Sequence, residues 1–322
     1  MRKCLKLLPA LFCLLHAAEP EFDERLRAAV ELEKLGDYRC AERALLALLK
    51  DNAGLGPDDP RRGVVVHRLG SVYHWQGKYL ESEASYREAI RVWRSRGSDE
   101  IALAQSTRSL AALYLETGHT ARAGRLGLDE IATRLEATQP QSTALAGIEG
   151  TLGTLALVQG QWGQAETYYR RAVALWEKLA PNDEERPELL TNLGLLYYRA
   201  GRYAEAQQTY EQALALDEKL LGTGHPEEAR VLVNLGAVAF KTQGPAEAIP
   251  FYQRAIAIGE RSLGAEHPVV GRVLVEYAFV LRQAKRKAEA KRCQRRGEEI
   301  LMAAAQHDGR NYTIDVAELR RP

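Results

Sequence analysis

The sequence lacks the motifs that mark most enzymes and metalloproteins. It contains no G-x-x-x-x-G-K-[ST] loop, no G-x-G-x-x-G following a strand, no H-E-x-x-H, no G-x-S-x-G and no C-x-x-C. His67 and His74 are two helical turns apart, and that spacing, about 10.5 Å by helix rise, is too long for one shared metal ion. We therefore expect no catalytic residue, no metal site and no cofactor, and a protein that is not an enzyme.

The chain also lacks an excess of charge of either sign and any long hydrophobic run. Its 44 basic residues nearly equal its 43 acidic residues, so no overall field attracts nucleic acid or a membrane surface. Nothing in the sequence is long and apolar enough to span a bilayer. The hydrophobic content of 46% is nevertheless ample for a continuous core.

What the chain does have is a repeated unit, of which residues 192–221 are the clearest copy. This stretch reads NLGLLYYRAGRYAEAQQTYEQALALDEKLL and predicts two amphipathic helices joined by a turn at Gly201. Small residues at Gly194, Ala206 and Ala213 let the two helices approach closely, and large side chains fill the space between them. A single pair cannot bury its apolar face alone, so neighbouring pairs must cover it.

The unit recurs seven times with a period of 41 or 42 residues. The equivalent dipeptides are Ala28-Ala29, Leu69-Gly70, Leu110-Ala111, Leu152-Gly153, Leu193-Gly194, Leu235-Gly236 and Tyr277-Ala278. The turn glycine recurs with the same period, at Gly36, Gly77, Gly118, Gly160 and Gly201. In the sixth copy the turn lies at Gln243-Gly244, and in the seventh Lys285 takes the place of the glycine. A chain of 322 residues alone suggests two globular domains, but the repeat predicts a linear stack of helix pairs instead.

The pattern L-G-x-x-Y…G…A-x-x-x-Y-x-x-A resembles the tetratricopeptide repeat over roughly residues 22–304. The period exceeds the usual 34 residues, and Gly-x-x-His-Pro segments lie between units at His225-Pro226 and His267-Pro268, with Asp59-Pro60 in the matching place. These features are similar to the kinesin light chain type of the repeat. The resemblance implies an all-α, right-handed superhelical solenoid of about seven helix-turn-helix repeats, and it implies no catalytic residue.

The third copy departs most from this pattern. Gly127 stands where the other copies have an aromatic residue, and Glu130 replaces the small residue. Gly124 and Gly127 each weaken a helix by about 1 kcal/mol relative to alanine. We expect this copy to be the loosest joint in the stack.

The resemblance also indicates a candidate binding surface, because in this family the first helix of each pair lines the concave side. In the related light chains, an asparagine before the Leu-Gly dipeptide contacts the backbone of a bound peptide. Only Asn192 and Asn234 match it here. An amide carries both donors and an acceptor and so suits an extended strand. The alternative is a solvent-facing asparagine with no partner.

Other positions expected to face this groove are basic: Arg199, Arg230, Lys241, Arg272 and Arg282. We predict a peptide-binding set of Asn192, Arg199, Arg230, Asn234 and Lys241. Arginine and lysine both bind carboxylates, so the partner expected is a protein or peptide, acidic or ending in a carboxylate. Glu188 and Glu276 oppose this interpretation, and a face of mixed charge is the alternative.

Residues 282–296 form a basic run with eight basic residues and one acidic residue. A polar outer cap is the ordinary role of such a run, since terminal repeats need one for solubility. The alternative is an adaptor that docks through its basic last repeat onto an anionic surface or partner. No aromatic residues are interleaved for stacking on bases, which disfavours nucleic acid. The function predicted first is a non-enzymatic protein-interaction scaffold that holds a peptide in its groove.

The N-terminal end does not belong to the repeats. Arg2, Lys3 and Lys6 precede an apolar run over residues 7–15, and His-Ala-Ala-Glu-Pro follows at 16–20. This order is typical of a secretory signal peptide over residues 1–18, cleaved after Ala17 or Ala18. We expect an exported protein, periplasmic or secreted; the alternative is a cytoplasmic protein with an apolar N-terminus.

Cysteine use does not decide between these compartments. Cys4 and Cys13 would leave with the signal peptide, and Cys40 and Cys293 lie in the first and last repeats. A disulfide needs Cα atoms within about 7 Å, which six stacked units between them exclude, so we expect two lone thiols.

The tail at residues 305–322 does not match the repeat and reads equally well as a short strand or a helix on the last unit.

Overall fold

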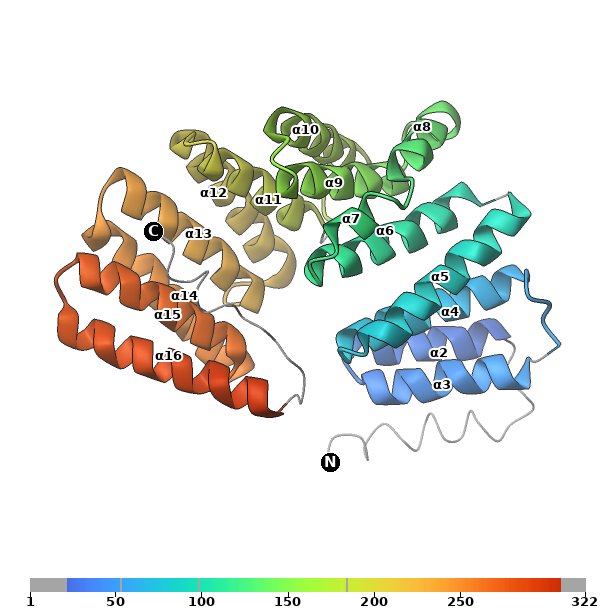
Figure 1. The fold of residues 1–322 in the computed structure, drawn as a ribbon, viewed down its shortest axis with the longest axis horizontal. Helices are drawn as coiled ribbons and strands as arrows, with labels where there is room; N and C mark the ends of the chain where they lie inside the picture. The colour runs from blue at the N-terminus through green and yellow to red at the C-terminus, as the bar shows by residue number, and fades with distance from the viewer. Residues whose placement is uncertain (1–21, 53, 98, 184, 308–322) are drawn as a thin grey trace. The chain divides into compact units, whose positions relative to one another are not determined.

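The computed structural model describes residues 22–307 apart from 53, 98 and 184, and every regular element in these ranges is a helix (Figure 1). The predicted signal peptide, and the tail from residue 308 onward, lie outside the described residues. The chain divides into two compact units after Gly160. No helix in the described part is both long and apolar enough to cross a membrane.

Helices of the first unit follow the predicted pairing: α2 (Phe22–Lys34), α3 (Tyr38–Asp51), α4 (Pro60–Trp75), α5 (Tyr79–Arg96), α6 (Glu100–Glu116), α7 (Thr120–Ala123), α8 (Leu128–Thr138) and α9 (Thr143–Val158). Those of the second unit are α10 (Trp162–Leu179), α11 (Glu185–Arg199), α12 (Tyr203–Leu221), α13 (Pro226–Thr242), α14 (Pro245–Leu263), α15 (Pro268–Gln283) and α16 (Lys287–His307). Within each unit, consecutive helices pack into pairs and each pair packs on the next. The predicted all-α repeat class is confirmed.

The turns within pairs lie where the repeat count places them. Gly201 adopts a left-handed φ of 74°, and the Arg202 N–H donates to the Tyr197 carbonyl at 2.9 Å, which caps the end of α11. The same conformation recurs at Gly36, Gly77, Gly118 and Gly160. In the last pair Lys285 takes it with a φ of 60°, as the one non-glycine residue of positive φ in the described ranges.

Close packing within pairs depends on a glycine of the first helix lying against a tyrosine of the second. A Cβ atom placed on Gly194 would lie 2.6 Å from the Tyr210 ring, and one on Gly236 would lie 2.8 Å from the Tyr252 ring. Tyr210 is buried, with 1% of its surface exposed. The predicted role of the small residues in close helix approach is therefore confirmed.

Proline and a capping side chain start three of the first helices. Asp59, His225 and His267 are the N-caps of α4, α13 and α15, and each accepts a hydrogen bond from the backbone two residues on. A proline follows each cap at the first helical position, where its missing N–H costs nothing. The two histidines are thus connector residues at helix starts, as the repeat spacing predicts.

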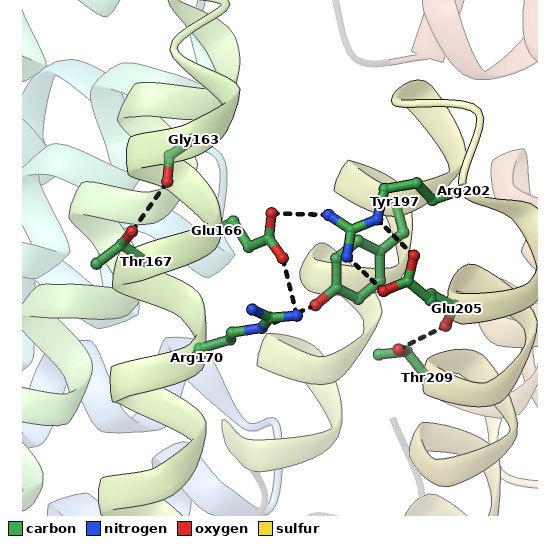
Figure 2. A network of polar contacts seen from close by, with 8 residues as sticks. All are labelled: Gly163, Glu166, Thr167, Arg170, Tyr197, Arg202, Glu205 and Thr209. Carbon is green, nitrogen blue, oxygen red and sulfur yellow. Dashed lines mark hydrogen bonds and ion pairs between the residues drawn. The ribbon is translucent and has the colours of Figure 1, made fainter.

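A polar network joins three successive helices of the second unit (Figure 2). Arg202, at the start of α12, forms an ion pair with Glu166 of α10 at 2.8 Å and another with Glu205. Its guanidinium lies 4.3 Å from the centroid of the Tyr197 ring on α11, and Arg170 of α10 donates to the Tyr197 hydroxyl at 3.1 Å. Each ion pair is partly exposed and worth about 1 kcal/mol or less, but together they fix one repeat on the next.

The same arrangement occurs in the first unit at equivalent positions. Lys78 pairs with Glu42 at 2.8 Å and lies 5.3 Å from the centroid of the Tyr73 ring. A related set forms in the third pair from Arg122, Glu83 and Tyr114. An acid on one second helix, a base near the following turn and a tyrosine between them therefore form a recurring connection between repeats.

The second helix of the third pair is interrupted. Figure 1 shows α7 and α8 as separate helices, and residues 124–127 between them include Gly127 with a left-handed φ of 77°. Gly127 occupies the position of the packing tyrosine, and Ala111 occupies that of the close-packing glycine. The glycine–tyrosine contact of the second, fifth and sixth pairs is therefore absent here, and the helix breaks in the copy where the sequence predicts weakness.

Asp217 is a carboxyl in a position where two other copies have a tryptophan. Trp93 and Trp176 occupy the equivalent place, and the Trp93 indole donates to Ser106 of the next repeat at 3.2 Å. The residue equivalent to Ser106 beside Asp217 is Val231, whose side chain forms no hydrogen bond. Asp217 is 2% exposed, its Oδ2 has no partner in the described part of the chain, and burial raises its pKa to about 6.

Gly194→Ala should destabilise the second unit by about 1–3 kcal/mol, because the added methyl overlaps a buried tyrosine ring. Gly163→Ala is the matched control, since a Cβ there meets nothing within 4 Å, and it should leave stability unchanged or raise it by up to about 1 kcal/mol. Urea unfolding followed by circular dichroism measures both. Equal midpoints for the two variants would contradict the close-packing role.

Asp217→Asn should stabilise the protein at pH 7.5 and not at pH 4. The pKa is raised from 3.8 to about 6, so the folded state keeps the proton that the unfolded chain releases. Stability is therefore lost as pH rises from about 4 through 6, by roughly 2–3 kcal/mol. Thermal unfolding of both proteins across this range measures the difference, and an Asn variant with the wild-type pH profile would contradict the assignment.

Candidate functional site

The first helices of three successive pairs, α11, α13 and α15, leave one side of each helix uncovered. Residues at i, i+4, i+7 and i+11 share a helix face. On these helices the residues at that spacing are exposed or half-buried, whereas the Leu-Gly positions between them are buried. We call this surface the first-helix face; it consists of Glu188, Asn192, Leu195, Arg199, Arg230, Asn234, Ala237, Lys241, Arg272, Glu276, Phe279 and Gln283.

All five predicted binding residues lie on the first-helix face. Asn192 and Asn234 are half-buried and take equivalent positions on neighbouring helices. Arg199 and Lys241 are exposed in the last turns of α11 and α13, and Arg230 is exposed near the start of α13. Arg230 and Lys241 are about 16 Å apart by helix rise. The fold thus aligns the asparagines and separates the basic residues into two groups at opposite ends of the helices.

The basic group near the helix starts is partly neutralised. Arg230 pairs with Glu227 at 3.1 Å, with both side chains substantially exposed. Exposed pairs of this kind are worth at most about 1 kcal/mol, so the guanidinium can exchange this partner for another carboxylate. No ion pair within the described residues involves Arg199 or Lys241.

An apolar strip runs along the middle of the first-helix face, and it was not among the positions expected from the sequence. Leu195, Ala237 and Phe279 occupy the same place on the three helices, two residues after the Leu or Tyr of each registered dipeptide. Phe279 is 42% exposed, and its ring lies 5.6 Å from that of Phe240 on the neighbouring helix. Counting in the same steps of 41 or 42 from the second residue after each registered Leu or Tyr would have identified this strip from the sequence.

Glu276 takes the asparagine position on α15 and changes the electrostatics of that end. The Glu276 side chain is partly open to solvent. The surrounding protein still removes enough water from its carboxylate to raise its pKa, and the charge of Arg272 lowers the pKa by a smaller amount. Burial likewise raises the pKa of Tyr198, and the neighbouring Tyr203 and Glu276 raise it further. The face therefore has uncharged amides on α11 and α13 and a partly desolvated acid on α15.

The histidines considered as ligands have other contacts. His67 lies with its Nδ1 3.0 Å from the Ser106 hydroxyl, and burial, together with Arg68 and Arg108, lowers its pKa to about 4. His74 pairs with Glu116 and stacks on Trp75. Among the described residues no group of three or more His, Cys, Asp or Glu side chains is placed to hold a metal ion.

The cysteines and the basic run are likewise located. Cys40 and Cys293 are free, half-buried thiols. In the basic run, Arg286 pairs with Glu289 at 2.6 Å and Arg296 with Glu260 at 2.6 Å. Further bases remain exposed there, namely Arg282, Lys285, Lys287, Lys291, Arg292 and Arg295.

Comparison with known proteins agrees with this architecture. The family model of the tetratricopeptide repeat matches residues 61–129, 144–219, 185–260 and 227–303. No curated protein matches the sequence significantly. The chain is similar to BtubC (BKLC) from P. vanneervenii, with 22% identity over 71% of this chain and 90% of that chain and a TM-score of 0.58.

Two further solved structures show the same fold. A putative kinesin light chain of Podosopora anserina with tetratricopeptide-like repeats is 22% identical over 65% of this chain and 98% of its own, with a TM-score of 0.53. The apo form of RapI is 12% identical over 89% of this chain and 100% of its own, with a TM-score of 0.68. Repeats of this kind are generally non-catalytic scaffolds for protein partners. The chain belongs to the tetratricopeptide repeat family.

Proposed function

We propose that the protein is a non-enzymatic scaffold that holds an extended segment of a protein partner on the first-helix face of α11, α13 and α15. The observation that carries this proposal is the alignment of Asn192 and Asn234 on neighbouring helices beside the apolar strip. Amides next to apolar contacts supply both backbone recognition and a surface for side chains.

The geometry suits an extended segment. Packed helices lie about 10 Å apart, and an extended chain advances about 3.3 Å per residue. The two asparagines therefore meet backbone groups about three residues apart along the bound segment. Leu195, Ala237 and Phe279 offer alternate side chains of that segment an apolar contact.

Charge favours an acidic segment over part of this face. Arg199 and Lys241 are exposed together at one end of the asparagine pair, and Arg230 lies at the other. Arginine holds a carboxylate through two parallel hydrogen bonds and lysine as a point charge. Glu276 repels acidic groups on α15, so we place the acidic residues of the partner beside α11 and α13.

Docking through the basic last repeat is the competing function. The exposed bases of residues 282–296 are its basis. Binding to an anionic surface loses affinity steeply with salt, whereas asparagine contacts with a peptide backbone lose much less. The slope of affinity against salt concentration therefore distinguishes the two functions.

A library of extended peptides displayed on phage, selected on the purified protein, supplies ligands for the test. Asn192→Ala combined with Asn234→Ala should weaken the selected peptides by about tenfold or more, since each lost hydrogen bond is worth about 1 kcal/mol. Gln208→Ala with Gln212→Ala, which removes two exposed amides from α12, is the matched control and should bind normally. Fluorescence anisotropy measures all three affinities.

Equal affinity of the asparagine variant and the wild type would overturn binding on the first-helix face. If binding then also fell steeply with salt and was lost on replacing Lys287, Lys291 and Arg292 by glutamine, the basic last repeat would be the docking surface. The asparagine variant and the glutamine control should both unfold at the wild-type midpoint, because the replaced amides are not part of the core. Unfolding followed by circular dichroism measures this.

We also propose, from the N-terminal sequence alone, that the protein is exported. The mature chain should begin near Glu19, because the signal peptide ends in Ala17-Ala18. Mass spectrometry of the protein recovered from its native source measures the N-terminus. Recovery of an intact Met1 would contradict export.

A further inference from the structure

The break between α7 and α8 is accompanied by a cavity that is separate from the first-helix face. The cavity has a volume of about 560 Å³ and is formed by α5, one residue of α6 and the segment that links α7 to α8. Its lining residues are Arg87, Ile90, Arg91, Arg94, Ser95, Leu110, Arg125 and Leu126. A volume of this size falls within the range of small-molecule binding sites.

Four of these residues are arginines, and no carboxylate is among the described lining residues. Arg91 pairs with Asp58 at 2.7 Å and Arg87 pairs with Glu83 at 3.0 Å, both acids lying outside the lining. Because only two of the four arginines pair with these acids, the cavity keeps an excess of positive charge.

The remaining two arginines, Arg94 and Arg125, form no ion pair with any acid in the described part of the chain. The Arg94 guanidinium donates to the Leu126 carbonyl at 3.3 Å. The Arg125 side chain is exposed and forms no ion pair within the described residues. The broken segment thus brings Arg125 to a helix that already presents three arginines, and like charges gathered in this way favour an anion between them.

The spacing of the arginines indicates more than one anionic group. Arg87, Arg91 and Arg94 lie on one side of α5 and extend along it over about 10 Å by helix rise. A single tetrahedral anion reaches two neighbouring guanidinium groups but does not bridge that length. Ile90 and Leu110, both buried, form an apolar floor beneath them.

We infer that this cavity binds a small molecule with two or more phosphate groups. The planar guanidinium group matches phosphate oxygens with paired hydrogen bonds, and four such groups around one cavity can hold several phosphates together. The four arginines lie on α5 and the broken segment, so the site shares no residue with the first-helix face and does not depend on peptide binding there.

Calorimetric titration with inorganic tripolyphosphate, in magnesium-free buffer of constant ionic strength, tests the inference. The wild type should bind one equivalent per chain. Arg94→Gln combined with Arg125→Gln should weaken binding at least tenfold. Arg27→Gln combined with Arg39→Gln removes the same charge from exposed arginines of α2 and α3 outside the cavity, and it should bind as the wild type does.

The single variant Arg125→Gln guards against misfolding, because this exposed side chain has no ion pair to lose; it should also weaken binding. The inference is overturned if the wild type shows no saturable binding, or if the Arg94/Arg125 variant binds as tightly as the control. Orthophosphate should bind at least tenfold more weakly than tripolyphosphate. Equal affinity for the two anions would overturn the requirement for several phosphate groups.

Discussion

The contact between a glycine on one helix and a tyrosine ring on the next determines how closely the helices of the second, fifth and sixth pairs approach. Gly70, Gly194 and Gly236 lie against Tyr86, Tyr210 and Tyr252, with no room for one more carbon atom. These contacts bury one side of α11 and α13, and Tyr277 and Ala278 are buried on the same side of α15, so the opposite side of the three helices remains open. The first-helix face is therefore a direct consequence of the packing inside the pairs.

The third pair lacks this contact and is irregular. It has Ala111 in the glycine position and Gly127 in the tyrosine position, and its second helix is divided into α7 and α8. Residues 125 and 126 of the break line a cavity together with residues of α5 and with Leu110 of α6. The irregular repeat thus contributes to a surface site through its break.

Much of the fold was predictable from the sequence because it is periodic. The positions of the turn glycines, the capping residues Asp59, His225 and His267, and the small packing residues all follow from counting in steps of 41 or 42. The alignment of Asn192 with Asn234 followed from the same count. Each of these features depends on residues within one unit or at identical positions in neighbouring units.

Other features were not predictable because they depend on distant residues that only the fold brings together. Arg125 joins the arginines of α5 only because the helix breaks beside it. The low helix propensity of Gly124 and Gly127 predicts a weak helix there, but it does not predict the path that the chain takes after the break. The buried Asp217 carboxyl lacks the partner that Ser106 gives Trp93, because Val231 takes the serine position. The apolar strip was within reach of the periodic count, but a search confined to polar positions passed over it.

The left-handed turn at Lys285 has a consequence for cooperativity along the array. A lysine in this conformation costs about 1–2 kcal/mol more than a glycine, and the turn belongs to the last pair, α15 and α16. In a linear array whose units couple to their nearest neighbours, a penalty at an interior unit is opposed by two interfaces, whereas a penalty at an end is opposed by one. The last pair therefore opens more readily than an equally strained interior pair would, and it can do so while the pairs that carry Asn192 and Asn234 stay folded.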